Sequence, residues 1–243
     1  MITSKDNKLI KYLIAIKDKK QSRLDSVCLI ETYKIVRQMI DNGRVIHIIC
    51  VEEKRDLFQN LGIPLDTISG GIANFISDAI TTDGVFAICK IETPNTINYS
   101  RCLILDNLQD PSNLGSIVRS ARAFGFDTIF AINSVYPFSF KCIRSSMGYI
   151  FDINLIEITY EKLKETKFEK DIKFVCADMF GESIEKFDKR PQNLGVIIGS
   201  EGKGVSDILK DMADYTVSIP MQNQVESLNA SVSASIFMFN LKK

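Results

Sequence analysis

The stretch IGSEGKGVS, residues 198–206, places three glycines, a glutamate and a lysine directly after an apolar run. A nucleotide-triphosphate loop follows the pattern G-x-x-x-x-G-K-[ST], whereas Lys203 is followed here by Gly204. The dinucleotide fingerprint G-x-G-x-x-G is also absent, because the three glycines form the pattern G-x-x-G-x-G. What remains is a loop at the carboxyl end of a strand, where ligands bind open α/β sheets and glycines let the backbone approach a ligand closely. A tight turn that binds nothing is the alternative.

The composition is that of a folded protein with balanced charge. The chain has 243 residues, 45% of them hydrophobic, and a formal net charge of zero. This length accommodates one large domain or two ordinary ones. No apolar run reaches the ~18 residues of a membrane span, and no signal-peptide core follows Met1, so we expect a cytoplasmic protein without a membrane segment. The six cysteines and the single histidine lack metal-ligand spacing, so we expect reduced, buried thiols and no bound metal.

The N-terminal stretch up to Arg23 combines an apolar stripe with many basic residues. Leu9, Tyr12, Leu13 and Ile16 recur at helical spacing. Seven basic residues surround them, namely Lys5, Lys8, Lys11, Lys17, Lys19, Lys20 and Arg23. The pattern predicts one helix with a buried stripe and a basic outer face suited to RNA phosphates. An ordinary solvated face is the alternative.

Strand-like and helical segments alternate along the chain, with one interruption. Strand-like segments at 27–31, 44–53 and 84–90 alternate with helical ones. The stretch ETPNTINYS, residues 92–100, then breaks the periodicity and is typical of a linker. We therefore expect one domain at residues 1–92 and a second at residues 97–243.

The second expected domain repeats the alternation of strands and helices. Its strand-like segments are residues 101–108, 127–133, 153–158, 172–179, 194–199 and 215–220. Helical segments separate them and a last helix begins at about residue 227. Such an order predicts a mostly parallel sheet covered on both faces.

The helix expected at residues 113–125 has an apolar stripe and two arginines outside it. The stripe consists of Leu114, Ile117, Val118, Ala121 and Phe124. Arg119 and Arg122 lie off this stripe. Asn113 follows the turn-like sequence DNLQDPS and stands where a helix-capping side chain is expected.

The stretch SIPMQNQVESLNASVSASI, residues 218–236, is rich in small residues. Leu228, Val232, Ile236 and Phe239 keep helical spacing, while the intervening positions are mostly alanine and serine. Small residues let another backbone come close, either from the same chain or from a second subunit. Ser227 and Asn229 stand at the start of this helix, where free N–H groups await a cap or a ligand.

Taken together and in this order, these stretches resemble the three motifs of the SpoU-type branch of the SPOUT RNA methyltransferases. DNLQDPSNLGSIVRSARAFGF (106–126) is similar to the first motif, IGSEGKGVS to the second and IPMQNQVESLNASVSASI (219–236) to the third. The segment KCIRSSMGYIF (141–151) is similar to the family's second helix region. Residues 1–90 more weakly resemble the family's substrate-binding domain, including LIETYKIV and TTDGVFAI.

The resemblance implies an α/β fold with a SPOUT-type parallel sheet whose C-terminal part forms a trefoil knot, preceded by a small α/β ribosomal-protein-like domain that binds the RNA substrate. It implies S-adenosylmethionine as the cofactor and an active site at a homodimer interface. The implied reaction is methyl transfer to a ribose 2′-hydroxyl of RNA. Ribosomal RNA is the first expected substrate because of the extra domain, and transfer RNA is the second.

The resemblance also implies the site residues. Arg119 matches the arginine said to activate the hydroxyl, although a guanidinium is too basic to accept a proton, which favours a positioning role. Asn113 matches the residue that orients this arginine, and Glu201, Ser227 and Asn229 match the remaining polar positions. The cofactor contacts implied are Gly199, Ile219, Leu228 and Ala177. No metal is implied.

Three residues depart from the family pattern. Asn223 and Thr32 stand where glycine is usual, and Ala230 where valine is usual. Asparagine tolerates positive φ better than other residues, so we expect the Asn223 loop to keep its shape. Lys203 has no implied role. Two other functions stay open at this point: a non-catalytic RNA-binding or ribosome-assembly protein, and a monomeric Rossmann-like methyltransferase of small molecules.

Overall fold

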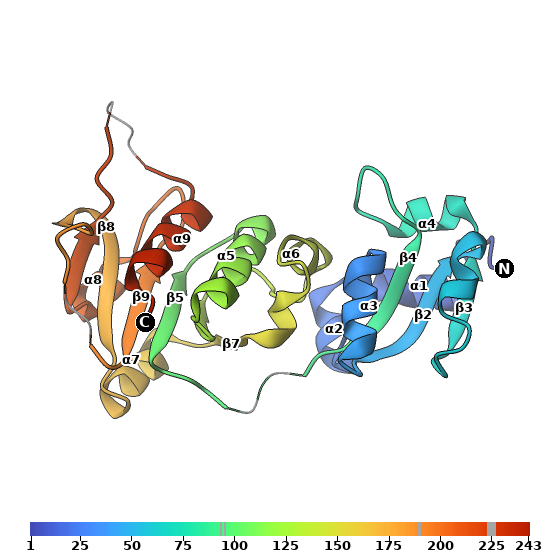
Figure 1. Ribbon diagram of the computed structural model, residues 1–243, viewed down its shortest axis with the longest axis horizontal. Coiled ribbons are helices and arrows are strands. Elements are labelled where there is room, and N and C mark those ends of the chain that lie inside the picture. Colours follow the sequence, from blue (N-terminus) through green and yellow to red (C-terminus); the bar gives the residue numbers. More distant parts are fainter. Residues whose placement is uncertain (93, 95, 189–190, 223–226) are drawn as a thin grey trace. The chain divides into compact units, whose positions relative to one another are not determined.

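The computed structural model describes residues 1–92, 94, 96–188, 191–222 and 227–243 (Figure 1). The chain divides into two compact units. The first contains Met1–Glu92 and Phe138–Phe151, and the second contains Thr93–Pro137 and Asp152–Lys243. Residues 138–151 therefore pack in the first unit, although they lie within the range expected for the second domain. Asn223, which stands where the family pattern has glycine, lies outside the described ranges.

The first unit is built on a mixed sheet with the strand order β1-β4-β2-β3. Its strands are β1 (Val27–Glu31), β2 (Val45–Val51), β3 (Leu65–Ile68) and β4 (Val85–Lys90). β4 runs antiparallel to both β1 and β2, and β2 runs parallel to β3. Its helices are α1 (Lys8–Ala15), α2 (Lys19–Asp25), α3 (Tyr33–Asp41), α4 (Gly70–Ile76) and α6 (Phe140–Ser145), with the 3-10 turns η1 (Glu52–Leu57) and η2 (Tyr149–Asp152).

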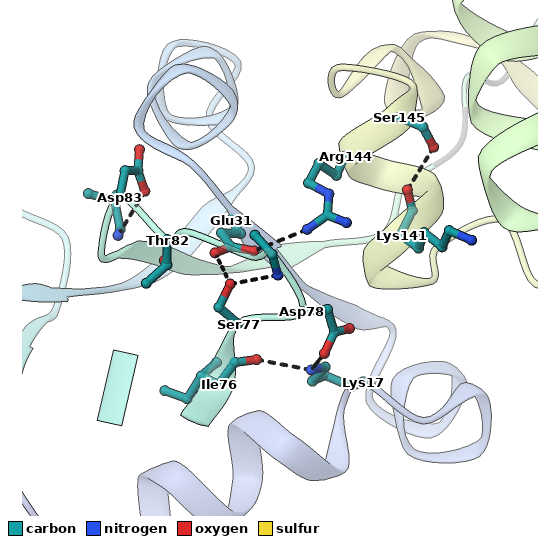
Figure 2. A network of polar contacts seen from close by, with 12 residues as sticks. Lys17, Glu31, Ile76, Ser77, Asp78, Thr82, Asp83, Lys141, Arg144 and Ser145 are labelled. Carbon is teal, nitrogen blue, oxygen red and sulfur yellow. Dashed lines mark hydrogen bonds and ion pairs between the residues drawn. The ribbon is translucent and has the colours of Figure 1, made fainter. Parts of the chain in front are cut away.

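The N-terminal basic stretch forms two helices, so the prediction of one helix was wrong. The chain breaks after α1, and Asp18 caps α2 by accepting a hydrogen bond from the Lys20 amide at 2.8 Å. Lys17, in the break, turns inward and donates to the Ile76 carbonyl at 2.9 Å, and it also pairs with Asp78 (Figure 2). Lys17 is thus not part of a basic outer face.

Thr32, between β1 and α3, has a backbone conformation that suits glycine. Its φ is +84° and its ψ is 136°, a region that a β-branched residue rarely adopts. Two backbone hydrogen bonds hold it there: its N–H donates to the Val85 carbonyl at 3.0 Å, and its carbonyl accepts from the Val36 N–H at 2.9 Å. Its side chain makes no cap for α3. The structure therefore explains why the family pattern has glycine at this position.

Glu31, at the end of β1, is the most buried carboxylate of a polar network in the first unit. Only 3% of the residue is exposed. The Ser77 hydroxyl donates to Glu31 Oε1 at 2.5 Å, and Arg144 Nη1 of α6 faces Oε2 at 3.9 Å, as Figure 2 shows. Within the described part of the chain, neither Oε2 nor Nη1 has a hydrogen-bond partner. Charge attraction rather than a hydrogen bond therefore joins α6 to β1 at this point.

The second unit contains a six-stranded sheet in which every pairing is parallel, as predicted. Its strands are β5 (Arg101–Asp106), β6 (Thr128–Ile132), β7 (Asn154–Glu157), β8 (Lys173–Ser183), β9 (Leu194–Ile198) and β10 (Tyr215–Ser218). The spatial order is β10-β8-β9-β5-β6-β7. A Rossmann sheet would place the fourth strand of the unit beside the first, whereas here the fifth, β9, takes that place. This exchange excludes the Rossmann-like alternative.

Four helices complete the second unit: α5 (Pro111–Phe124), α7 (Tyr160–Glu169), α8 (Asp207–Met212) and α9 (Ala230–Leu241). Leu163 of α7 and Leu209 of α8 join a core cluster with Phe174 and Ile197 of the sheet. α5 and α9 pack against each other, side by side in Figure 1, and α9 also contacts β9. Both pairs of helices thus cover parts of the sheet.

The apolar residues that keep helical spacing in this region do not form the buried side of the last helix. The helix begins at Ala230 rather than near Ser227, and its buried residues include Ala230, Ala234 and Phe237. Val232 and Phe239 of the predicted stripe are 46% and 55% exposed. Alanines at 230 and 234 allow close packing on the unit, and because this helix is apolar on most sides, periodicity alone could not select the buried one.

We expect Thr32→Gly to raise the free energy of unfolding of the first unit by roughly 1 kcal/mol. Relief of a disfavoured backbone conformation outweighs the added freedom of glycine in the unfolded chain. Chemical denaturation followed by circular dichroism measures this. The matched control is Thr159→Gly at the cap of α7, where φ is −90° and the side chain accepts from the Lys162 N–H. That change should lower stability by a few tenths of a kcal/mol, and a loss at Thr32 would contradict the argument.

We expect Arg144→Ala to destabilise the first unit by about 2 kcal/mol, because it leaves Glu31 buried without a counter-charge. The effect stays below that of a fully buried pair because 33% of the Arg144 side chain is exposed. In a Glu31→Gln background the same change should cost far less. Arg37→Ala, which breaks the exposed Arg37–Asp41 pair at 3.5 Å, should change stability by less than about 0.5 kcal/mol. Equal losses in both backgrounds would show that the two charges do not interact.

Candidate functional site

A cavity of about 330 Å³ lies in the second unit, where five segments of the chain meet. It is lined by residues 177–180 of β8, the loop after β9, Lys210 of α8, the segment after β10 and the region around the start of α9. Ends of parallel strands and their loops are the usual ligand-binding region of open α/β sheets, and this volume is that of a small-molecule site. The cavity lining includes all four residues expected to contact a cofactor, Ala177, Gly199, Ile219 and Leu228, together with Glu201 and Ser227.

The loop after β9 is closed on itself. The Ser200 N–H donates to the Gly204 carbonyl at 3.2 Å, and the Gly204 N–H donates back to the Ser200 carbonyl at 2.9 Å. A Cβ at Gly199 would lie 2.1 Å from the Gly204 carbonyl carbon, and Gly204 has a φ of +65°. Two of the three glycines are therefore required by the loop's own closure, the tight-turn explanation that the sequence had left open beside close approach to a ligand.

Asn113 joins the three motifs through its side chain. It is the third residue of α5 and only 9% exposed. Its Nδ2 donates to Glu201 Oε1 of the closed loop, and its Oδ1 accepts from Asn229 Nδ2 at 3.0 Å. Asn229 in turn caps α9, because its Oδ1 accepts from the Ser231 N–H at 2.8 Å. Glu201, Asn113 and Asn229 thus form one hydrogen-bonded set beside the cavity.

Asn113 is not the cap of α5, contrary to the sequence interpretation. Asp110 takes that position and accepts a hydrogen bond from the Ser112 N–H at 3.0 Å. Pro111 occupies the first helical turn, where its missing N–H costs nothing. Because Asp110 supplies the cap, the side chain of Asn113 is available for the two contacts described above.

Arg119 is the one expected site residue that neither joins this hydrogen-bonded set nor lines the cavity. It is exposed on α5 and does not line the cavity. The next residue, Ser120, exchanges a hydrogen bond of 2.8 Å with Ser235 of α9. Arg119 is thus an exposed residue next in the chain to one that joins α5 to α9. Ser227 lines the cavity directly.

The cavity also contains an ion pair that no sequence motif indicated. Lys210 Nζ of α8 lies 2.8 Å from Asp178 Oδ2 of β8, and both residues line the cavity. Burial alone would raise the pKa of Asp178, but hydrogen bonds from Lys210 and from the Phe180 N–H lower it below its usual value. Lys203 lies on the lining as well. Since Asp178 and Lys210 are far apart in the chain, only the fold reveals their pairing.

Three further observations bear on the class of site. In the ranges that the structure describes, no group of three or more His, Cys, Asp or Glu side chains could hold a metal ion. No helix among these residues has the length and apolar character needed to cross a membrane. All six cysteines are buried and free, as expected. Burial raises the pKa of Cys102 to about 12 and that of Cys176 to about 11, so these thiols are poor nucleophiles.

Comparison with known proteins gives three similarities. The model of the SpoU rRNA Methylase family matches residues 100–239. The 23S rRNA (guanosine(2553)-2'-O)-methyltransferase RlmP of Bacillus subtilis is 24% identical over 249 aligned residues, which cover 99% of this chain and 98% of that protein. A Staphylococcus epidermidis protein assigned to the TrmH family of tRNA/rRNA methyltransferases is 37% identical over 147 residues, 59% of this chain and 58% of its own length.

The fold also has a counterpart among solved structures. The SpoU methyltransferase AviRb of Streptomyces viridochromogenes, solved in complex with AdoMet, superimposes with a TM-score of 0.86 at 20% identity, covering 97% of each chain. This likeness confirms the expected α/β fold with its parallel sheet. The family model spans more than half of the sequence and contains all three motifs. This protein belongs to the SpoU rRNA methylase family.

Proposed function

We propose that this protein transfers a methyl group from S-adenosylmethionine to a ribose 2′-hydroxyl of RNA, with ribosomal RNA as the substrate. The observation that carries the proposal is the hydrogen-bonded set of Glu201, Asn113 and Asn229 beside a cavity of small-molecule size. RlmP, an enzyme acting on 23S rRNA, aligns over nearly the whole chain and so supports the choice of substrate. Transfer RNA is the second candidate, because the staphylococcal relative is named for both RNA classes.

The residues around the cavity suit S-adenosylmethionine. The lining offers charges of both signs, Asp178 and Glu201 against Lys203 and Lys210. S-adenosylmethionine carries a carboxylate, an ammonium and a sulfonium, so the basic side chains can pair with its carboxylate and the acidic side chains with its two positive groups. The proposed contacts from Gly199, Ile219, Leu228 and Ala177 place backbone and apolar groups around the rest of the ligand. When bound, the cofactor supplies a methyl group on a positively charged sulfur.

The chain's own residues would then orient the RNA hydroxyl. That hydroxyl must lose its proton as it attacks the methyl carbon, and a guanidinium cannot accept a proton near neutral pH. Arg119 is therefore proposed to hold the hydroxyl or its neighbouring phosphate through charge-assisted hydrogen bonds. Glu201, fixed by Asn113, and Ser227 at the cavity wall are the proposed polar partners of the reacting groups.

A homodimer is part of the proposal. α9 exposes Val232 and Phe239 side chains, and Phe124 of α5 packs edge-on against Phe239 at 5.8 Å between ring centroids. An exposed apolar face of this kind is typical of a subunit interface. Arg119 borders this face, since its neighbour Ser120 bonds Ser235 of α9. Pairing two copies through α5 and α9 would thus bring Arg119 to the interface, where the partner's cavity could receive it.

The knot and the roles of the domains are further parts of the proposal. A knotted C-terminal half is proposed from membership of the SpoU family. Residues 97–243 are the proposed methyltransferase domain. Residues 1–92, with the basic residues of α1 and α2, are the proposed RNA-binding domain, and a ribosomal substrate gives a cytoplasmic location. The Lys17 side chain, turned toward Ile76 and Asp78, is excluded from the proposed RNA surface.

The proposed activity predicts transfer of label from S-adenosylmethionine to total RNA from cells lacking the gene. Arg119→Ala should reduce transfer by at least about 100-fold and leave cofactor affinity within about tenfold, because Arg119 does not line the cavity. Arg122→Ala is the matched control: Arg122 lies on the same helix, does not line the cavity and pairs with Asp127 at 3.3 Å, so activity should persist. Wild-type protein that binds the cofactor without transferring label would refute the enzymatic proposal, and lost cofactor binding in Arg119→Ala would refute the role of Arg119.

The proposed homodimer predicts that Phe239→Glu yields monomers, because it places a charge on the exposed apolar face of α9. Phe168→Glu is the control, since Phe168 is 72% exposed on α7, away from that face. Sedimentation velocity should find dimers for the wild type and Phe168→Glu, and monomers for Phe239→Glu. A monomeric wild type would contradict the proposal, as would a dimeric Phe239→Glu variant.

A further inference from the structure

We infer that Asp106 is a positioning residue for the cofactor cavity: its buried carboxyl group fixes the exit of the loop that forms one cavity wall. Asp106 is the last residue of β5 and has no exposed surface. It does not line the cavity and so touches neither of the proposed substrates directly. The inference deepens the proposed function by assigning a residue that acts through the loop.

Three hydrogen-bond donors from different segments converge on Asp106. The Ser206 N–H donates to Oδ2 at 2.7 Å. The Tyr160 hydroxyl donates to Oδ1 at 2.9 Å, and Asn107 Nδ2 donates to the same oxygen at 2.7 Å. A buried carboxyl group is costly unless it is hydrogen-bonded, and these donors satisfy both of its oxygens. Asp106 therefore joins the end of β5 to the first residues of α7 and α8.

Asn107 adopts the conformation that this arrangement needs. Its φ is +55°, a left-handed conformation that asparagine tolerates better than most residues. Its side chain bonds back to Asp106 and also lies 3.4 Å from the Tyr160 hydroxyl. The turn after β5 thus supplies both the acceptor and one of its donors, and Tyr160 of α7 supplies another.

Ser206 is the point at which the cavity loop leaves for α8. It precedes the first helical residue, Asp207, and its side chain makes no cap. Its hydroxyl oxygen is buried without a hydrogen-bond partner among the described residues. Its carbonyl accepts from the Leu209 and Lys210 N–H groups of α8, and its N–H donates to Asp106, which ties this position to the end of β5. The loop between Gly199 and Ser206 supplies Glu201, Lys203 and Val205 to the lining. A shift of Ser206 would therefore move part of the cavity wall.

The loop consequently has two polar anchors from the same motif. Glu201, near its tip, is held by Asn113, and Ser206, at its exit, is held by Asp106. Both anchoring residues flank the turn between β5 and α5. Residues 201–204 are exposed, whereas Val205 beside Ser206 packs in the core cluster that includes Leu209. Packing therefore helps to hold the exit of the loop, and hydrogen bonds to the first motif orient its exposed part.

The test compares Asp106→Ala with Asp214→Ala. Asp214 is a matched control, because it also accepts a backbone N–H, that of Phe174 at 2.8 Å, and pairs with Lys167, but it lies off the cavity. Both changes should lower thermal stability. Asp106→Ala alone should accelerate hydrogen exchange at residues 199–206 and weaken S-adenosylmethionine binding by calorimetry on the order of tenfold to 100-fold, because the Ser206 N–H loses its acceptor.

Two milder variants keep the test decisive if Asp106→Ala fails to fold. Asp106→Asn can still accept from the Ser206 N–H and should weaken binding less than alanine does. Tyr160→Phe removes one donor and leaves the Ser206 bond, so its binding loss should be smaller still. Unchanged loop exchange in Asp106→Ala and Asp106→Asn would overturn the inference, as would equal binding losses in the Asp106 and Asp214 variants. Absence of cofactor binding by the wild type would instead refute the proposed function, and loop exchange would still test Asp106.

Discussion

The cavity depends on one side chain, that of Asn113, which forms hydrogen bonds in two directions. Its amide nitrogen holds Glu201 of the closed loop, and its amide oxygen holds Asn229 at the start of α9. A primary amide is the side chain that can donate and accept at once in fixed geometry. A carboxylate at this position would repel Glu201, and an apolar residue would leave both neighbours unpaired. The loop after β9 and the start of α9, which both line the cavity, are therefore positioned relative to α5.

The strand order explains why these segments meet at all. β9 lies between β5 and β8, so the loop that follows β9 emerges next to the turn that follows β5. In a sheet with the Rossmann order, β8 would occupy that place and the loop after β9 would be displaced by one strand. The contact between Asn113 and Glu201, residues separated by 88 positions in the chain, is thus a consequence of the exchange of β8 and β9.

Much of the fold could be predicted from the sequence, because its strands and the amphipathic α5 have strong patterns. The stripe of Leu114, Ile117, Val118 and Ala121 is buried as predicted. The last helix was different: it is apolar on nearly all sides, so periodicity pointed to Val232 and Phe239, which are exposed. Strand order and the mixed sheet of the first unit also escaped prediction, since local patterns give the presence of a strand and not its neighbour.

The candidate site, like the fold, was predicted only in part from the sequence. The resemblance identified residues that the structure brings together, such as Glu201 and Asn229, which both bond Asn113. It could do so because the three motifs contain the polar residues of the site, although they lie far apart in the chain. It could not find the pair of Asp178 and Lys210, whose partners lie on different elements and carry no joint pattern. The local sequence pattern, rather than the resemblance, misassigned the cap of α5, because DNLQDPSN contains several capping residues and only the backbone shows that Asp110 is the one used.

Of the two explanations that the sequence left open for the glycines of the loop, turn closure accounts for Gly199 and Gly204. A loop that must present side chains to a ligand while staying exposed has little packing to fix it. The two hydrogen bonds between Ser200 and Gly204 constrain the backbone of this short loop, and Gly199 has no Cβ that would collide with Gly204. The loop is then oriented by bonds from Asn113 and Asp106, since hydrogen bonds are directional where apolar contacts are not. IGSEGKGVS therefore makes a defined wall only in combination with the DNLQDPSN turn, which is why neither stretch alone predicted the site.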